Sequence, residues 1–333
     1  MLSPLIMNRL IPSARLPQPF PQGTVSDHLA ALGPSTISTQ TPLSPSMSPI
    51  TALNPKRRTH VMSILNVTPD SFSDGGVNEP NNLDQLKSTI LSHVMDGATI
   101  IDVGGQSSRP HAPEVSTEEE IARVLPAIQL IRSLPEAQNI AISIDTYRAA
   151  VAEAAVKAGA HIINDVSAGT MDENMLSIMA RLGVTVCLMH MRGTPHTMTS
   201  KENTSYPDGI VPTVARELLD RVAAAEAAGI RRWRIILDPG IGFAKNQEQN
   251  LELLRRMDEL RDWPGLKGLS WLVGTSRKGF IGKITGVKNA RERSWGTAAA
   301  VTAAVQGGAD IVRVHDVGEM AKVTKMADAI WRV

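Results

Sequence analysis

The sequence predicts one α/β barrel of eight strand–helix units, a (β/α)8 or TIM barrel, behind a disordered N-terminal extension. Three observations favour this fold. Short apolar runs alternate with longer segments of helical periodicity from residue 60 onward. The runs are apolar at nearly every position, which is typical of parallel strands covered by helices on both faces. The chain has 333 residues, enough for one barrel of roughly 250 residues and an extension.

The extension is expected to cover residues 1–58, and the barrel residues 59–333. Residues 1–58 hold ten of the 21 prolines and a single acidic residue, Asp27. Frequent proline removes backbone donors, and no apolar periodicity is long enough to bury a face. Two interpretations stay open. The segment is a leader or linker without chemistry, or it is a mitochondrial presequence. The second is suggested because the segment is rich in Ser, poor in acidic residues and begins with an apolar stretch that contains Arg. The expected location is therefore mitochondrial or cytoplasmic.

The expected strands follow one another at regular intervals along the remaining chain. They cover His60–Asn66, Thr99–Val103, Ile140–Ile144, His161–Asn164, Val184–Met189, Arg234–Leu237, Ser270–Gly274 and Asp310–Val314. The expected helices cover Leu83–Asp96, Thr117–Arg132, Tyr147–Ala158, Asp172–Arg181, Gly209–Ala228, Asn246–Asp258, Asn289–Gly307 and Val317–Trp331. Eight such units match a closed barrel. The alternative, a doubly wound open sheet, normally has a glycine-rich turn after its first strand, whereas this chain has Asn-Val-Thr-Pro there.

The composition excludes several classes of protein. The 34 basic and 33 acidic residues balance, so nothing points to nucleic acid or to an anionic membrane. No apolar stretch approaches the ~20 residues of a membrane span. The single cysteine, Cys187, rules out a disulfide scaffold and lies in an apolar strand, where an inert core thiol is expected. Small-molecule substrates remain as the expected partners.

Polar residues follow the predicted strands at the end where such barrels carry their chemistry. Any one of them has a structural explanation, because a single Asp or Asn also caps the next helix. All eight strands, however, deliver polar groups to the same end, and this favours a binding site. The groups are Asn66, Asp102, Asp145, Asn164, His190, Asp238, Ser276–Lys278 and Arg313–His315.

Two parts of this collection suggest what is bound. Arg313 and His315 follow the eighth strand, in the quarter where barrels bind phosphate, and Asn66 and Arg109 belong to the neighbouring strands one and two. Together they suit a polyanion. Acidic and amide groups from strands three, four and six suit a planar heterocycle with several N–H donors. These groups are Asp145, Asn164 and Asp238.

Eight segments in order resemble the motifs of the dihydropteroate synthase family. They are Asn66–Gly76, Gly97–Pro110, Ser143–Thr146, Ile163–Val166, Met189–Gly193, Asp238–Asn246, Gly274–Lys278 and Arg313–His315. The resemblance covers nearly everything from His60 to Trp331. It implies an enzyme that condenses 6-hydroxymethyl-7,8-dihydropterin diphosphate with p-aminobenzoate, giving 7,8-dihydropteroate and pyrophosphate in folate biosynthesis. It also implies Mg²⁺ as cofactor, a homodimer and a sulfonamide target.

The resemblance further implies a role for each matched residue. The pterin would contact Asp145, Asn164, Asp238, Lys278 and Met189. The diphosphate would contact Asn66, Arg109, Arg313 and His315, with Asn66 also touching Mg²⁺. The p-aminobenzoate would contact Phe72, Ser108, Pro110, Phe243 and Lys278. Arg109, Arg313 and His315 would stabilise the leaving group, and we expect no covalent nucleophile or general base.

Other interpretations stay open. A pterin-binding methyltransferase domain acting on a methylated reduced folate shares the barrel and the pterin contacts, but it has no diphosphate to hold. A non-catalytic pterin-binding paralogue is a third class. His315 and His190 could instead be structural histidines bonded to their surroundings. The chain also departs from the family pattern at Gln106, Ser108 and Gly279.

Overall fold

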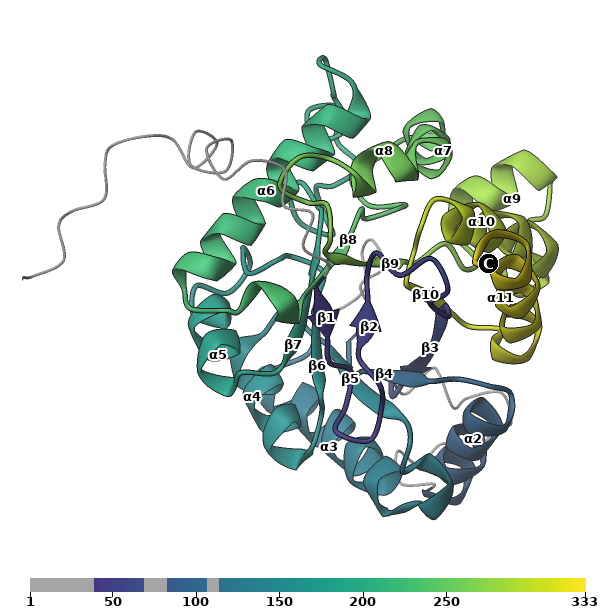
Figure 1. The fold of residues 1–333 in the computed structure, drawn as a ribbon. Coiled ribbons are helices and arrows are strands. Elements are labelled where there is room, and N and C mark those ends of the chain that lie inside the picture. The colour runs from purple at the N-terminus through teal and green to yellow at the C-terminus, as the bar shows by residue number, and fades with distance from the viewer. Residues whose placement is uncertain (1–38, 69–82, 107–113) are drawn as a thin grey trace, which may run out of the picture.

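The computed structural model of the chain describes residues 39–68, 83–106 and 114–333, and in it eight parallel strands form a closed barrel (Figure 1). The last strand pairs with the first, so the predicted barrel is confirmed and an open sheet is excluded. The strands are β3 (His60–Asn66), β4 (Ile100–Gly104), β5 (Ala141–Asp145), β6 (Ile162–Asp165), β7 (Thr185–Met189), β8 (Ile235–Asp238), β9 (Ser270–Val273) and β10 (Ile311–Val314).

Helices surround the barrel as an outer ring (Figure 1). Their bounds are α2 (Leu83–Met95), α3 (Thr117–Ser133), α4 (Ala149–Ala158), α5 (Met175–Leu182), α6 (Ile210–Ala227), α7 (Gln247–Arg255), α8 (Met257–Arg261), α9 (Gly279–Thr285), α10 (Ser294–Gln306) and α11 (Val317–Trp331). None of the described helices is long and apolar enough to cross a membrane.

Three helices differ from the prediction. The segment expected as Asn246–Asp258 is divided into α7 and α8 at Arg256, whose backbone leaves the helical region. The segment expected from Asn289 begins as a helix only at Ser294, because Asn289 caps a separate short 3₁₀ turn. The short helix α9 was not expected, since its seven residues contain two glycines and give no clear period.

The strand register places the polar residues in one row at the carboxyl end of the barrel. Asn66 is aligned with Gly104, Gly104 with Asp145, and Asp145 with Asn164. Because inward positions recur every second residue, the positions below this row also face the interior. Directly below Gly104 and Asp145 these positions are the buried polar residues Asp102 and Ser143. Deeper in the barrel the inward residues are apolar, and they pack as one cluster: Met62, Ile100, Ala141, Ile162, Cys187, Ile236, Leu272 and Ile311. An apolar layer therefore supports the polar one.

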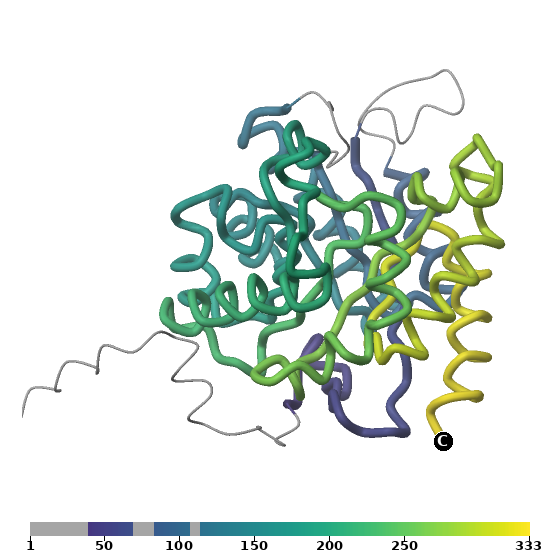
Figure 2. The backbone as a smooth tube through the Cα atoms, turned by 90° about the horizontal axis from the view of Figure 1, so that it is seen from above, coloured from purple at the N-terminus to yellow at the C-terminus, as the bar shows by residue number. Residues whose placement is uncertain are grey.

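The prediction of disorder over residues 1–58 is wrong for residues 39–58. There β1 (Gln40–Thr41) pairs antiparallel with β2 (Ile50–Thr51) below the barrel (Figures 1 and 2). Leu43 and Ile50 are 1% and 3% exposed and join the interior cluster. Residues 39–58 show no apolar periodicity because this hairpin covers the open end of an existing barrel rather than forming a face of its own. Residues 1–38 lie outside the described part of the chain.

Candidate active site

The centre of the polar row is Arg313, whose side chain spans from β10 to two other strands. Its Nε donates to Asp102 Oδ2 and its Nη2 to Asp145 Oδ2, each at 2.6 Å. Asn164 Nδ2 donates to the same Asp102 oxygen at 2.9 Å. Four strands, β4, β5, β6 and β10, are thus tied together by one charged network inside the barrel.

The carboxyl groups of this network are strongly affected by burial. Burial raises the pKa of Asp145 to about 7, Arg313 opposes this, and the neighbouring carboxylates add to it. Burial also raises the pKa of Asp238. Asp102 is fully buried, and its Oδ1 has no hydrogen-bond partner within the described ranges. Since an unpaired buried acceptor is costly, a ligand that donates N–H groups here would satisfy it.

Asp238 ends β8 and begins a tightly folded loop. Its Oδ1 accepts a hydrogen bond from Gly240 N at 2.7 Å. Gly240 has a φ of +68°, and a Cβ built there would lie 2.0 Å from the backbone oxygen of His190. Only glycine fits this approach. The Asp-Pro-Gly spacing therefore brings the loop back over the end of β7.

Lys278 and Phe243, predicted to contact the same substrate, are brought together. Lys278 Nζ lies 4.6 Å from the centroid of the Phe243 ring, within cation–π range, and also donates to the Ile241 carbonyl oxygen. Burial lowers the pKa of Lys278 to about 8, and Asp238 opposes that shift. The site therefore has a cation, Lys278, beside an aromatic ring, and both lie next to the carboxyl side chain of Asp238.

His315 directly follows β10, and Asn66 ends the adjoining strand β3. The backbone N of His315 donates to Ser276 Oγ at 3.1 Å, and its ring Nδ1 lies at the same distance from that oxygen. Asn66 Oδ1 lies beside Gly104, since a Cβ built at Gly104 would be 3.5 Å from it and 3.7 Å from Asp145 Oδ2. The glycine leaves space between two oxygen-bearing side chains.

The structure thus gathers most of the residues selected from the sequence at one end of the barrel. These are Asn66, Asp145, Asn164, Met189, Asp238, Phe243, Lys278, Arg313 and His315. The remaining four predicted residues lie outside the described part of the chain: Phe72, Ser108, Arg109 and Pro110.

One spatial expectation is corrected. The sequence suggested cations on one side and carboxylates on another, yet Arg313 lies between Asp102 and Asp145. It occupies an inward position two residues before His315, and a long side chain there reaches across the barrel. Asp102 was noted only as a strand end. The signal for it was a carboxylate inside the otherwise apolar run Ile100–Gly104.

Sequence reasoning missed a second buried cluster behind the Asp238 loop. Lys245 Nζ lies 2.9 Å from His190 Nδ1, and His190 Nε2 lies 2.8 Å from Glu217 Oε2. Burial is the main reason that the pKa of His190 falls to about 4. His190 is therefore a buried, hydrogen-bonded residue, in agreement with the structural interpretation of it. Glu217 comes from the middle of α6, which gave no functional signal.

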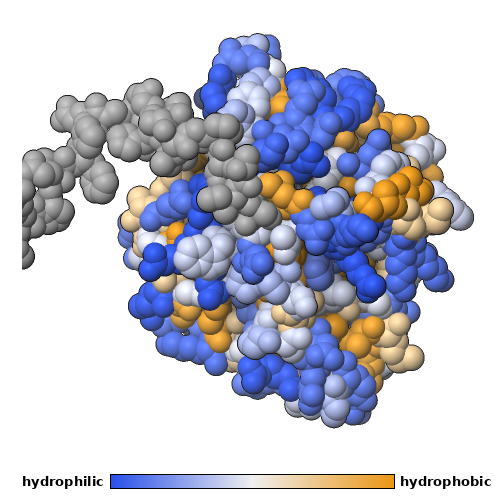
Figure 3. Space-filling view, in the orientation of Figure 1, coloured by the Kyte–Doolittle hydropathy of each residue, from blue (hydrophilic) through white to orange (hydrophobic). Residues whose placement is uncertain are grey.

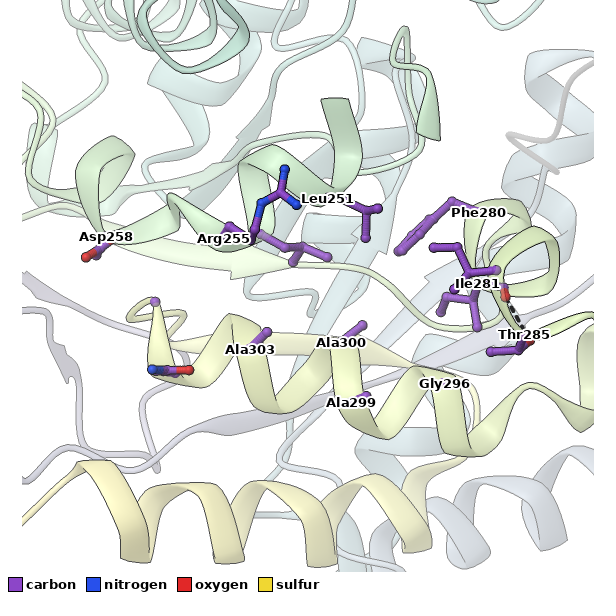
Figure 4. A pocket seen from close by; sticks show the side chains of 14 residues that line it. Leu251, Arg255, Asp258, Phe280, Ile281, Thr285, Gly296, Ala299, Ala300 and Ala303 are labelled. Carbon is purple, nitrogen blue, oxygen red and sulfur yellow. Dashed lines mark hydrogen bonds between the residues drawn. The ribbon is translucent and has the colours of Figure 1, made fainter. Parts of the chain in front are cut away.

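A cavity of about 600 Å³ lies away from the polar row, on the outside of the barrel between α7, α9 and α10 (Figure 4). Its wall is mostly apolar, with Leu251, Phe280, Ile281 and Ala300 among the lining residues. It contains none of the polar strand ends. The convergence of side chains, rather than cavity size, therefore identifies the candidate active site.

Comparisons with known proteins show which family the chain belongs to. The family described as "Pterin binding enzyme" matches residues 62–315. A dihydropteroate synthase of Synechocystis is 48% identical over 276 residues, covering 83% of this chain and 91% of that protein. A folic acid synthesis protein of Schizosaccharomyces pombe is 54% identical over 270 residues, covering 81% of this chain. A mitochondrial folate synthesis bifunctional protein of Arabidopsis thaliana is 45% identical, covering 83% of this chain. This chain spans only 36% of the fungal relative and 50% of the plant one.

Two solved structures have the same fold. A dihydropteroate synthase from Clostridium difficile, crystallised in the presence of pteroic acid, superposes with a TM-score of 0.75 at 42% identity, covering 84% of this chain and 98% of that one. A dihydropteroate synthase from Xanthomonas albilineans with 4-aminobenzoic acid superposes with a TM-score of 0.73 at 39% identity, covering 83% and 94%.

Proposed function

Because the chain belongs to the dihydropteroate synthase family of pterin binding enzymes, we propose that it condenses 6-hydroxymethyl-7,8-dihydropterin diphosphate with p-aminobenzoate. The products are 7,8-dihydropteroate and pyrophosphate. The observation that carries the proposal is the group of inward-facing carboxyl and amide side chains at the carboxyl end of the barrel, beside the Lys278–Phe243 pair. The residue roles that follow are part of the same proposal.

The pterin ring binds through its N–H groups. Its aminopyrimidinone edge has several donors, and Asp145, Asn164 and Asp238 offer acceptors on β5, β6 and β8. Burial of these groups excludes competing water, so each hydrogen bond is stronger than at the surface. Met189, at the end of β7 beside Asp238, adds an apolar contact.

The second substrate lies toward the rim. Its aromatic ring stacks near Phe243, and Lys278 supplies a positive charge nearby. The remaining contacts come from Phe72, Ser108 and Pro110 as predicted from the sequence. An aniline-type amine is already unprotonated at neutral pH, so it attacks without a general base.

Breaking the bond between the exocyclic carbon and oxygen leaves negative charge on the departing diphosphate. Arg313 on β10, His315 directly after it, and Arg109 stabilise that charge as it develops. Arg313 has a second task, because it also donates hydrogen bonds to the carboxyl groups of Asp102 and Asp145. Leaving-group binding is therefore coupled electrostatically to the pterin-binding carboxylates.

The residues present fit a magnesium ion held mainly by substrate. Mg²⁺ prefers oxygen ligands and usually takes one or two from protein and the rest from phosphates and water. Asn66 Oδ1 and the Asp145 carboxylate flank the space above Gly104, while the described residues contain no cluster of three or more His, Cys, Asp or Glu arranged for a metal. Asn66 would hold the ion, which when bound neutralises charge on the diphosphate.

Purified protein incubated with Mg²⁺, the pterin diphosphate and p-aminobenzoate should form dihydropteroate and pyrophosphate. Asp238→Ala should abolish pterin binding in calorimetry, whereas Arg313→Ala should bind pterin and lose most of its turnover. Methyl transfer from a methylated folate, with no dihydropteroate formed, would show the methyltransferase function instead. Unchanged kinetics in both variants would contradict the residue roles.

We also propose a homodimer. Trp295 on α10 is 90% exposed, and Ile284 near the end of α9 is 52% exposed, beside the outer cavity. In Figure 3, hydrophobic residues form several patches on the visible face, some of them on the side where Figure 1 places α9 and α10. We propose a mitochondrial or cytoplasmic location for the protein. The name of the plant relative states a mitochondrial one.

A further inference from the structure

Lys245 is a buried cation that the proposed chemistry does not use. It is 9% exposed, and its ammonium group has three hydrogen-bond partners. These are His190 Nδ1 at 2.9 Å, the Gly240 carbonyl oxygen at 3.0 Å and the Phe243 carbonyl oxygen at 2.9 Å. An ammonium has three N–H donors, so all three are used. Two of the three acceptors belong to the loop between Asp238 and Lys245.

The histidine that faces Lys245 is fixed from its other side. Its Nε2 lies 2.8 Å from Glu217 Oε2, and Glu217 is in turn held by Arg192. Because a carboxylate only accepts, Nε2 carries the histidine proton and Nδ1 is left as the acceptor for Lys245. Arg192 also lies 4.2 Å over the ring of Tyr206, whose hydroxyl donates to the Ala244 carbonyl oxygen at 2.9 Å.

The loop itself has little internal support. Ala244 has a φ of +49°, an unfavourable conformation for a residue with a side chain. Among the described contacts, the loop amides are held by Asp238 Oδ1 at Gly240, by Asn250 Oδ1 at Gly242 and by the Gly240 carbonyl at Phe243. The Lys245 ammonium holds two of the loop's carbonyls, those of Gly240 and Phe243. Lys278 holds the Ile241 carbonyl and Tyr206 holds the Ala244 carbonyl.

We infer that Lys245 is a positioning residue: its ammonium group, held by His190, fixes the 239–244 loop so that Asp238 and Phe243 face the active site. This rests on the proposed function in so far as Asp238 and Phe243 contact substrate. Lys245 itself touches neither substrate, because its three donors are used within the protein.

The arrangement makes the loop sensitive to pH near neutrality. Burial lowers the pKa of Lys245 to about 7. Of the charged groups that face it, Asp238 and Glu217 raise this pKa, and Lys278 and Arg192 lower it. A neutral amine has only two N–H donors, and His190 cannot supply a third because its proton faces Glu217. One of the three acceptors therefore loses its donor as the pH rises through 7, and the ammonium no longer links His190 to both loop carbonyls.

Hydrogen exchange of the free protein tests the inference without any substrate. In the wild type, amides 240, 242 and 243 should exchange about tenfold faster at pH 8 than at pH 6, after correction for intrinsic rates, since a charged hydrogen bond is lost. Lys245→Met should exchange at the fast rate at both pH values, with unchanged exchange elsewhere. Equal protection at both pH values in the wild type would overturn the inference, and this needs no variant.

Binding of 6-hydroxymethylpterin gives the functional readout. Lys245→Met should bind it about 10- to 100-fold more weakly at pH 6.5, and the difference from wild type should shrink toward pH 8. The control, Lys157→Met, removes an exposed lysine paired with Glu153 on α4 and should match wild type. Wild-type affinity and pH profile in Lys245→Met would refute the positioning role. Failure of wild type to bind pterin would refute the proposed function instead, while the exchange result would still stand.

Discussion

At the scale of single residues, Arg313 connects the strands that build the candidate site. Its guanidinium joins two carboxylates from different strands inside the barrel, and Asp102 is fully buried. A buried ion pair adds little net stability over apolar residues, but removal of one partner leaves a charge without compensation. The residue is therefore structural as well as functional.

Substituting Arg313→Ala should lower the free energy of unfolding by about 3–5 kcal/mol. Adding Asp102→Asn should recover part of that loss, because one of the two uncompensated carboxylates is removed. Urea denaturation of the single and double variants measures both values. A simple sum of the two single effects would contradict the coupling.

The pKa of Asp145 also predicts how stability depends on pH. The folded protein keeps the Asp145 proton up to about pH 7, whereas the unfolded chain loses it near its ordinary value of 3.8. The contribution of this group is therefore fully present below pH 3.8 and is lost as pH rises toward 7. Asp145→Asn should flatten the decline in unfolding free energy between pH 4.5 and pH 7. Parallel curves for variant and wild type would rule this out.

At the scale of elements, the hairpin of β1 and β2 closes one end of the barrel. Ser270 Oγ donates to Thr41 Oγ1 at 2.9 Å, and Thr39 Oγ1 donates to the Gly268 carbonyl at 2.7 Å. Leu43 fills the end of the interior cluster. The hairpin shields the apolar layer that lies beneath the active site.

Leu43→Ala should destabilise the protein by about 2–5 kcal/mol, the range for buried leucines. Leu83→Ala is the matched control, since Leu83 is 55% exposed at the start of α2 and should change stability by less than about 0.5 kcal/mol. Urea denaturation distinguishes them. Equal effects would mean that the hairpin does not bury Leu43 in solution.

The same elements show how far the sequence could predict the structure. The bounds of the eight strands agree with the prediction to about one residue. A short continuous apolar run is typical of a strand that is covered on both faces, so the run itself marks the strand. The hairpin was missed because its few apolar residues pack against the barrel rather than against one another. Among site residues, Asp238 ends β8 and Lys278 lies in the loop between β9 and α9, positions where such barrels carry their chemistry. The pairing of Lys245 with His190 depends on how the loop after Asp238 folds back over the end of β7. The order of residues in the sequence does not reveal that path.

At the scale of the whole molecule, the two ends of the barrel differ. One end is closed by the hairpin (Figure 2). The other end carries the polar row. The exposed apolar residues of α9 and α10 lie on the flank, so a dimer formed there would leave the active site open.

Light scattering should give twice the 35.8 kDa of one chain for the wild type. Trp295→Glu should reduce this to a single chain, because it places a charge in the proposed interface. Trp233→Glu, a substitution at a tryptophan that is 48% exposed on another part of the surface, should leave the dimer intact. A monomeric wild type would contradict the proposal.

The most direct test of the active site is a crystal structure with a pterin and pyrophosphate bound. We expect the ring within hydrogen-bond distance of Asp145, Asn164 and Asp238, and the anion beside Arg313 and His315. A pterin bound in the cavity between α7 and α10, or pyrophosphate remote from β10, would contradict the account.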